Sequence, residues 1–201
     1  MRRPSPKECA VGPVIAKVRK APVVGNFGNL TVHLVDASVP LQVRQAISHV
    51  AMVAQRSMSE YPAGYDGTVT EDDQRLYVLV DGDRVVAFAL TALDERFWRL
   101  SWATDGAIDL FEDTALSRRG PKVGRVWVAA SYRGKGLSVQ LVEVAAGHLA
   151  VAPSELGWEL PFTPAGRALV RHFCQSSFLG CGDVYSLTKA LNSKCSSTSA
   201  T

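Results

Sequence analysis

Long hydrophobic runs are absent from this sequence. No segment of its 201 residues approaches the roughly 20 consecutive apolar residues that a membrane-spanning helix needs. The N-terminal apolar stretch is interrupted by Pro13 and Lys17, so we expect no signal peptide there. These absences predict a cytoplasmic protein with no membrane partner.

An excess of charge of one sign is absent as well. The chain carries 22 Lys and Arg residues against 19 Asp and Glu residues, a net charge of +3. Basic residues are scattered apart from short pairs such as Arg2–Arg3 and Arg118–Arg119. Because nucleic-acid binding usually depends on a concentrated basic surface, we expect no nucleic-acid partner.

Cysteine is sparse, and its spacing is not that of a metal site. The four cysteines contain no CxxC pair, and the four histidines do not lie at ligand spacing from them. We therefore expect free thiols in a reducing compartment and no bound metal ion.

What is present is an ordinary globular composition, 47% hydrophobic and 20% charged. A chain of this length can bury a substantial core as one domain. Residues 1–28 mix Pro, Gly and Lys without clear periodicity, so we expect a loosely packed N-terminal extension there. The domain is expected at 29–190 and a disordered tail at 191–201.

The first half of the domain has the pattern of a strand, a helix and a hairpin. "NLTVHLVDA" (29–37) alternates apolar and polar residues, which predicts a strand. Ser38 and Pro40 precede apolar residues at helical spacing, which predicts a helix running towards Glu60. The segments "RLYVLV" and "RVVAFALTAL" flank "DGD" at 81–83, a pattern typical of a β-hairpin.

The second half alternates strands and helices. It is expected to begin with a short strand "ERFWRLSWA", an insertion at 104–123 with the loop "SRRGPKVG", a strand "RVWVAAS" (125–131) and a helix from Leu137 to Ala150. A strand "LGWELPF" (156–162) should follow, and then a helix "PAGRALVRHF" with Thr163 at its N-cap and Pro164 at its first position. The last expected element is a strand "DVYSLTKAL". The order predicts a mixed α/β (α+β) fold with a central, mostly antiparallel sheet flanked by helices.

The segment "YRGKGLS" (132–138) lies between a predicted strand and a predicted helix. Gly134 and Gly136 let backbone amides approach a ligand closely and adopt φ > 0. The N–H groups at the helix start point to the same place, and Arg133 and Lys135 add positive charge. Together these features favour a phosphate or pyrophosphate site, with a plain glycine-rich connection as the alternative.

Two common phosphate-binding motifs do not fit this segment. The P-loop pattern GxxxxGK[ST] is absent, and a dinucleotide fingerprint would need glycine where Val139 stands.

A third pattern does fit. Arg133–Ser138 resembles the [QR]-x-x-G-x-[GA] motif of the GNAT superfamily of acyl-CoA-dependent N-acyltransferases, with serine in place of the last small residue. The resemblance implies a GNAT fold and acetyl-CoA as co-substrate, its pyrophosphate held by backbone amides. The residues implied in binding it are Val126, Val128, Arg133, Gly134, Lys135, Gly136, Leu137 and Ser138.

The chain is also similar to the catalytic domain of sister-chromatid cohesion acetyltransferases. "RVWV" precedes the glycine turn, and "TPAGR" opens a helix that ends near Cys174. The zinc finger of that family is missing, and Leu160 and Pro161 stand where it has an acidic residue. We therefore carry over the fold and the cofactor, but not the cohesin substrate.

Acetyl transfer to an amine needs a base, an acid and donors for the thioester oxygen. Glu159 is the candidate base, and a solvent-facing strand residue is its equally open alternative. Tyr185 is the candidate acid for the departing thiolate, with Tyr132 as a second choice. The superfamily resemblance implies a backbone N–H donor at Val128 or Ala129.

Other chemically capable residues receive lesser roles. Asp183 could orient the amine, His172 is expected at or near the surface, and neither Cys174 nor Cys181 has an activating histidine at a suitable spacing. The aromatic group Phe97, Trp98 and Trp102 is expected in the core, with a wall of the acceptor site as the alternative.

These observations predict an acetyl-CoA-dependent N-acetyltransferase whose acceptor is a primary amine. That amine is a protein lysine or a small molecule, as in resistance or biosynthetic enzymes. A non-catalytic acyl-CoA sensor or partner module is the competing hypothesis, and a homodimer is left open.

Overall fold

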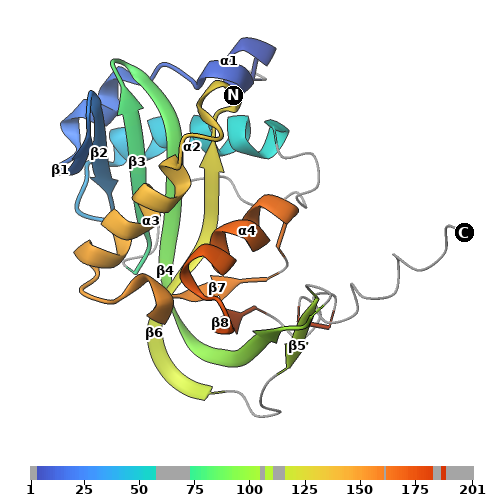
Figure 1. The fold of residues 1–201 in the computed structure, drawn as a ribbon. Helices are drawn as coiled ribbons and strands as arrows, with labels where there is room; N and C mark the ends of the chain where they lie inside the picture. The colour runs from blue at the N-terminus through green and yellow to red at the C-terminus, as the bar shows by residue number, and fades with distance from the viewer. Residues whose placement is uncertain are drawn as a thin grey trace, which may run out of the picture. The chain divides into compact units, whose positions relative to one another are not determined.

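The computed structural model describes residues 4–57, 73–104, 107–110, 116–160, 162–182 and 187–188 (Figure 1). Within these ranges eight strands form a mostly antiparallel sheet flanked by helices, which confirms the predicted mixed α/β class. Contacts divide the chain into two compact units, one of residues 1–91 and 125–148 and one of residues 92–124 and 149–201. The long strands β4 (Arg84–Trp102) and β6 (Leu116–Val128) contribute to both units.

Unit 1 contains the N-terminal strands and the predicted hairpin. Its first three strands are β1 (Val23–Phe27), β2 (Leu30–Val35) and β3 (Arg75–Asp81). The strands lie in the order β1-β2-β3-β4-β6. The pairs β1–β2, β2–β3 and β3–β4 are antiparallel, and the turn at 82–83 joins β3 to β4 as "DGD" predicted.

Helices cover both faces of this part of the sheet. Leu76, Val78 and Val80 of β3 belong to one core cluster with α2 (Leu41–Ser57), whereas Tyr77 and Leu79 belong to another with α3 (Leu137–His148). Figure 1 shows α2 and α3 on opposite sides of these strands. Side chains alternate between the two faces of a strand, so "RLYVLV" is apolar at nearly every position because both of its faces are buried.

The N-terminal segment is packed more closely than the sequence predicts. Residues 4–28 contain α1 (Pro6–Val11), a 3₁₀ helix η1 (Ala16–Lys20) and β1, which pairs with β2. Ile15, Val18 and Ala21 are buried in the cluster under α2. The expectation of a loose arm is therefore wrong for this segment, because its elements are too short to show periodicity in the sequence. The domain boundaries themselves stay a prediction.

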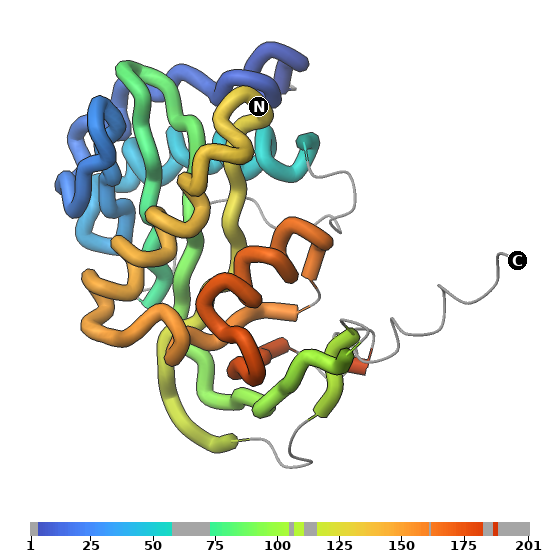
Figure 2. The backbone as a smooth tube through the Cα atoms, viewed as in Figure 1, coloured from blue at the N-terminus to red at the C-terminus, as the bar shows by residue number. Residues whose placement is uncertain are grey.

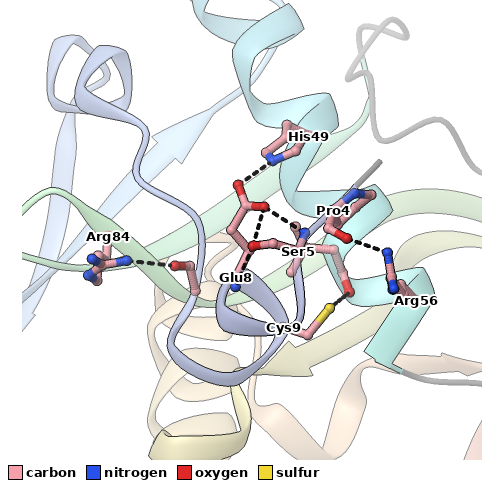
Figure 3. Close-up of polar contacts among 9 residues, drawn as sticks. Pro4, Ser5, Glu8, Cys9, His49, Arg56 and Arg84 are labelled. Carbon is pink, nitrogen blue, oxygen red and sulfur yellow. Dashed lines mark hydrogen bonds and ion pairs between the residues drawn. The ribbon is translucent and has the colours of Figure 1, made fainter. Parts of the chain in front are cut away.

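Helix α1 is held by hydrogen bonds at both of its ends (Figure 3). The Ser5 hydroxyl accepts from the Glu8 N–H, and a Glu8 carboxylate oxygen accepts from the Ser5 N–H at 2.8 Å, which forms a capping box. The Arg56 guanidinium of α2 donates to the Pro4 carbonyl, and that of Arg84 donates to the Gly12 carbonyl.

Unit 2 is a smaller mixed sheet with one α-helix of ten residues among its described residues. The strands β5 (Ile108–Leu110) and β8 (Ser177–Cys181) pair antiparallel with β4. Strand β7 (Gly157–Glu159) pairs parallel with β6 and with β8. A 3₁₀ helix η3 (Pro153–Glu155) precedes β7, and α4 (Pro164–Phe173) follows it.

The predicted cap of α4 is confirmed. Thr163 has extended backbone angles, its Oγ1 accepts from the Gly166 N–H at 3.1 Å, and Pro164 occupies the first turn.

Two other expectations differ from the structure. "ERFWRLSWA" is not a separate strand but continues β4, which is 19 residues long. "SRRGPKVG" is not a loop, since it lies inside β6 despite Gly120 and Pro121. Gly120 and Pro121 favour a turn, but the pairing of β6 with strands far away in the sequence, such as β7, keeps this segment extended.

The last predicted strand, "DVYSLTKAL", lies outside the described residues except for Leu187 and Thr188, which are helical. The strand that the structure does show, β8, precedes it. The predicted end of the α2 helix near Glu60 and the tail at 191–201 also lie outside the described residues.

No helix in the described part of the chain is both long and apolar enough to cross a membrane.

Candidate functional site

The glycine turn of unit 1 lies between the 3₁₀ helix η2 (Ala130–Tyr132) and α3. Gly134 has φ of +75° and Gly136 has φ of +73°, in the left-handed region that residues with a Cβ rarely adopt. A Cβ built on either glycine would have no described atom within 4 Å. The two glycines are thus required by the backbone conformation, and they leave open space beside it.

The start of α3 offers a row of backbone N–H groups. The N–H groups of Val139 and Gln140 bond to the Gly136 carbonyl at 3.0 and 3.2 Å and close the first helical turn. The N–H groups of Gly134–Ser138 have no hydrogen-bond acceptor among the residues that the structure describes. Such consecutive free donors, together with the positive end of the helix dipole, suit a phosphate or pyrophosphate.

The two cations of the turn are exposed and have partners close by. The Arg133 Nε donates to the Val128 carbonyl at 3.1 Å, and the Lys135 ammonium lies 5.0 Å from the centroid of the Tyr132 ring. The Tyr132 hydroxyl donates to Asp81 at 2.7 Å, and this hydrogen bond, followed by burial, raises the pKa of Tyr132. The second-choice acid is therefore engaged with a carboxylate, which makes it a poorer proton donor.

The other residues predicted to bind the cofactor lie in the same unit. Val126 and Val128 pack against the core cluster of α3, and Leu137 is buried in it. The Ala129 N–H donates to the Val86 carbonyl of β4 at 2.8 Å. Backbone groups alternate in direction along a strand, so those of Val126 and Val128 point away from β4. Of the two N–H groups predicted to donate to the thioester oxygen, that of Ala129 is already used in the hydrogen bond to Val86. The Val128 N–H is therefore the donor candidate that is left.

The predicted base, Glu159, ends strand β7 in unit 2. Its side chain is 45% exposed, and its Oε2 lies 3.4 Å from the Lys122 Nζ. The same ammonium lies 3.0 Å from the Asp94 Oδ2. Glu159 is thus neither buried nor a plain solvent-facing residue, because it belongs to a cluster of two carboxylates and one lysine.

Charge and burial act against each other in this cluster. Burial alone would lower the pKa of Lys122, but the charges of Glu159 and Asp94 outweigh burial and raise it. Burial alone would raise the pKa of Asp94, but hydrogen bonds from the Arg96 N–H and from Lys122 lower it overall. The ion pairs and hydrogen bonds therefore stabilise the charged forms of Lys122 and Asp94 against burial.

The remaining candidates do not form a second site in the described residues. Burial raises the pKa of the Cys174 and Cys181 thiols, which disfavours the nucleophilic thiolate. His172 is exposed on α4, as expected. Tyr185 and Asp183 lie outside the described residues. No group of three or more metal-type side chains is placed to hold an ion in the described ranges.

The three aromatic residues of β4 differ in their surroundings. Phe97 is 1% exposed, as the core prediction requires. Trp98 and Trp102 are half-buried. Trp102 stacks on Phe178 at 4.7 Å between ring centroids, and its Nε1 donates to the Cys174 carbonyl at 2.8 Å.

Sequence reasoning missed Lys122 and Asp94. Lys122 lies in a segment predicted to be a loop, and Asp94 lies between the predicted strand segments "RVVAFALTAL" and "ERFWRLSWA". No local signal could have joined them, because the cluster is assembled from three strands.

No family model and no curated protein matches the sequence. Solved acetyltransferase domains share its fold, a mixed sheet flanked by helices, as predicted from the sequence. One of them is the acetyltransferase domain of xEco2 bound to a K105–CoA conjugate, with a TM-score of 0.66 and 16% identity, covering 81% of this chain and 97% of that one. A second structure of the xEco2 acetyltransferase domain has a TM-score of 0.60 at 16% identity, covering 81% and 96%.

Proposed function

We propose that this protein is an N-acetyltransferase that uses acetyl-CoA and acts on a primary amine. The observation that carries the proposal is the glycine turn, in which both glycines are left-handed and five consecutive N–H groups, Gly134–Ser138, lack acceptors among the described residues. The fold shared with an acetyltransferase domain in complex with a CoA conjugate supports it.

The described residues fit the cofactor. The amides of the turn would hold the pyrophosphate, with Arg133 and Lys135 supplying positive charge beside it. The N–H groups of Val126 and Val128 and the Val126 carbonyl, which point away from β4, would hold the pantetheine arm, whereas the Val128 carbonyl accepts from the Arg133 Nε. Once bound, acetyl-CoA supplies an activated thioester.

The chain's own residues supply the rest of the chemistry. A primary amine is mostly protonated at neutral pH, and Glu159 would accept its proton directly or through a water. The Val128 N–H would donate to the thioester oxygen as negative charge develops there. Tyr185 is proposed to protonate the departing thiolate.

The test replaces both glycines of the turn. Gly134→Val with Gly136→Val should abolish detectable acetyl-CoA binding in calorimetry, because valine is strained at positive φ by about 1–2 kcal/mol per residue and fills the space beside the amides. The matched control is Gly147→Ala in α3, where a Cβ also meets no described atom, but where φ is not positive. Equal acetyl-CoA affinity in both variants would overturn the proposal.

The acceptor is proposed as a class, either a protein lysine or a small amine. Turnover measured over peptides containing lysine and over small polyamines separates the two. A non-catalytic acyl-CoA sensor remains the second candidate, since the buried Leu160 stands in the region where the cohesion family has an acid. Binding of acetyl-CoA without turnover of any amine would favour that candidate.

A further inference from the structure

The glycine turn of unit 1 begins at a tyrosine that is held in place. Residues 130, 131 and 133–136 are exposed, whereas Tyr132 between them is half-buried and its hydroxyl donates to the Asp81 Oδ2 at 2.7 Å. We propose that Tyr132 is a positioning residue, which its hydrogen bond to Asp81 fixes so that the glycine turn keeps its binding conformation before a pyrophosphate arrives. This inference rests on the proposed function, in which the turn binds acetyl-CoA.

The turn needs a fixed point at each end. Residues 133–136 are all exposed, and the two glycines among them allow many backbone conformations in the absence of other restraints. At the far end, Leu137 is 7% exposed and belongs to the core cluster of α3. With Tyr132 fixed as well, only residues 133–136 remain to be ordered by a ligand, so less conformational entropy is lost on binding.

Tyr132 is fixed by packing as well as by its hydroxyl. It packs against both core clusters of unit 1, the one with α2 and the one with α3. Its N–H donates to the Ala129 carbonyl at 2.9 Å. The hydrogen bond to Asp81, followed by burial, raises the pKa of Tyr132, so its hydroxyl keeps its proton and remains a donor at neutral pH.

The acceptor of this hydrogen bond belongs to the hairpin. Asp81 is the last residue of β3 and the register partner of Arg84, with which β4 begins. The preceding residues of β3, 76–80, are buried, and the Arg84 guanidinium donates to the Gly12 carbonyl at 3.1 Å. The hydrogen bond therefore ties the turn to a well-packed element that is 51 residues away in the sequence.

The two residues that flank Tyr132 have weaker contacts. The Ser131 hydroxyl donates to the Ala10 carbonyl at 2.8 Å, and the Arg133 Nε donates to the Val128 carbonyl at 3.1 Å, but both hydrogen bonds are exposed, so water competes for them. The Tyr132 hydrogen bond is partly buried and is accepted by a carboxylate, and both properties strengthen it.

The test uses two matched pairs, the wild type with Y132F and D81N with D81L. Y132F removes the hydroxyl but keeps the ring, whose centroid lies 5.0 Å from the Lys135 ammonium. D81N and D81L both remove the carboxylate charge, but only asparagine keeps an oxygen that accepts from Tyr132. Each pair therefore differs in the hydrogen bond at constant charge. Circular dichroism confirms that each variant is folded.

The first readout is backbone order without ligand, measured by nitrogen-15 NMR relaxation. The order parameters of residues 133–136 should fall from about 0.85 towards 0.6 in Y132F and in D81L, and should stay near the wild-type values in D81N. Unchanged turn order in Y132F or in D81L, or an equal loss in D81N and D81L, would overturn the proposal. A loss of order that extends to residues 76–80 of β3 would show a merely structural role and overturn it as well.

The second readout is the affinity for acetyl-CoA, measured by calorimetry. The Kd should be about fivefold higher in Y132F than in the wild type, and about fivefold higher in D81L than in D81N, because binding must then also order the turn. Equal affinities within each pair, with binding by the wild type, would overturn the role of Tyr132. If the wild type does not bind acetyl-CoA but the order parameters change as predicted, the proposed function alone fails and the positioning of the turn by Tyr132 stands.

Discussion

The Glu8 Oε1 of α1 lies 2.9 Å from the His49 Nε2 of α2 (Figure 3). Both side chains are largely buried, with exposed fractions of 13% and 19%. The other carboxylate oxygen of Glu8 completes the capping box with Ser5, so one side chain caps the start of α1 and ties α1 to α2. Figure 2 shows this N-terminal segment (dark blue) beside the turn before α3, where the Ser131 hydroxyl donates to the Ala10 carbonyl at 2.8 Å.

Replacement of Glu8 should therefore loosen the N-terminal segment. E8A removes the cap and the contact with His49, and we expect a loss of about 1–2 kcal/mol in the free energy of unfolding. Hydrogen exchange at residues 5–12 should rise in parallel. The matched control, E143A, removes an exposed glutamate from α3 and should stay within about 0.5 kcal/mol of the wild type. Equal effects of the two substitutions would contradict the anchoring role of Glu8.

Two glycines of unit 2 are required by packing. A Cβ at Gly157 would lie 2.1 Å from the Phe97 Cε1, and a Cβ at Gly180 would lie 2.4 Å from the Leu100 Cδ1. G180A should cost about 1–3 kcal/mol of stability, because Leu100 is fully buried and can move only by displacing its neighbours. G147A, with open space around its Cβ, should instead gain about 0.5–1 kcal/mol. Chemical denaturation of both variants measures the difference, and a neutral G180A would refute the close packing of β8 on β4.

The accuracy of the sequence predictions depended on how local each feature is. The "DGD" hairpin, the Thr163 cap and the glycine turn are fixed by neighbouring residues, and each was found. Strand β8 and the first part of β6 were missed, because both are stabilised by partners far away in the chain. Gly180 held a usable signal, since an isolated glycine in an apolar segment often marks close approach of another chain segment.

The candidate site also has one part made of neighbouring residues and one part assembled from residues far apart in the chain. The glycine turn is one continuous segment, so its residue types and spacing were enough to predict a phosphate site there. The Lys122 cluster joins β4, β6 and β7, and only the register of these strands brings its charges together.

The Asp94 carboxyl should make stability depend on pH in the acid range. Its folded pKa lies below its ordinary value of about 4, so its contribution is present above that value and is lost as the pH falls through the folded pKa. The difference in Tm between the wild type and D94N should be largest near neutral pH and should shrink below about pH 4. A difference that stays constant from pH 7 to pH 3 would contradict the ionised state of Asp94 in the fold.

The two buried thiols should be unreactive in the native protein. Burial raises the pKa of Cys174 and of Cys181, so at pH 8 both should resist a thiol reagent until the protein unfolds. Cys9 is only partly buried and should react first among the three described cysteines. Mass spectrometry of labelled peptides measures the order, and rapid native labelling of Cys181 would contradict its burial.

Calorimetric titration of the purified wild-type protein with acetyl-CoA, desulfo-CoA and ATP tests the central claim most directly. The account predicts micromolar binding of both CoA species, since each carries the pyrophosphate and the pantetheine arm, and no comparable binding of ATP. Absence of binding by either CoA species would mean that the turn of Gly134 and Gly136 only connects β6 to α3, and the proposed acetyltransferase would fall with it.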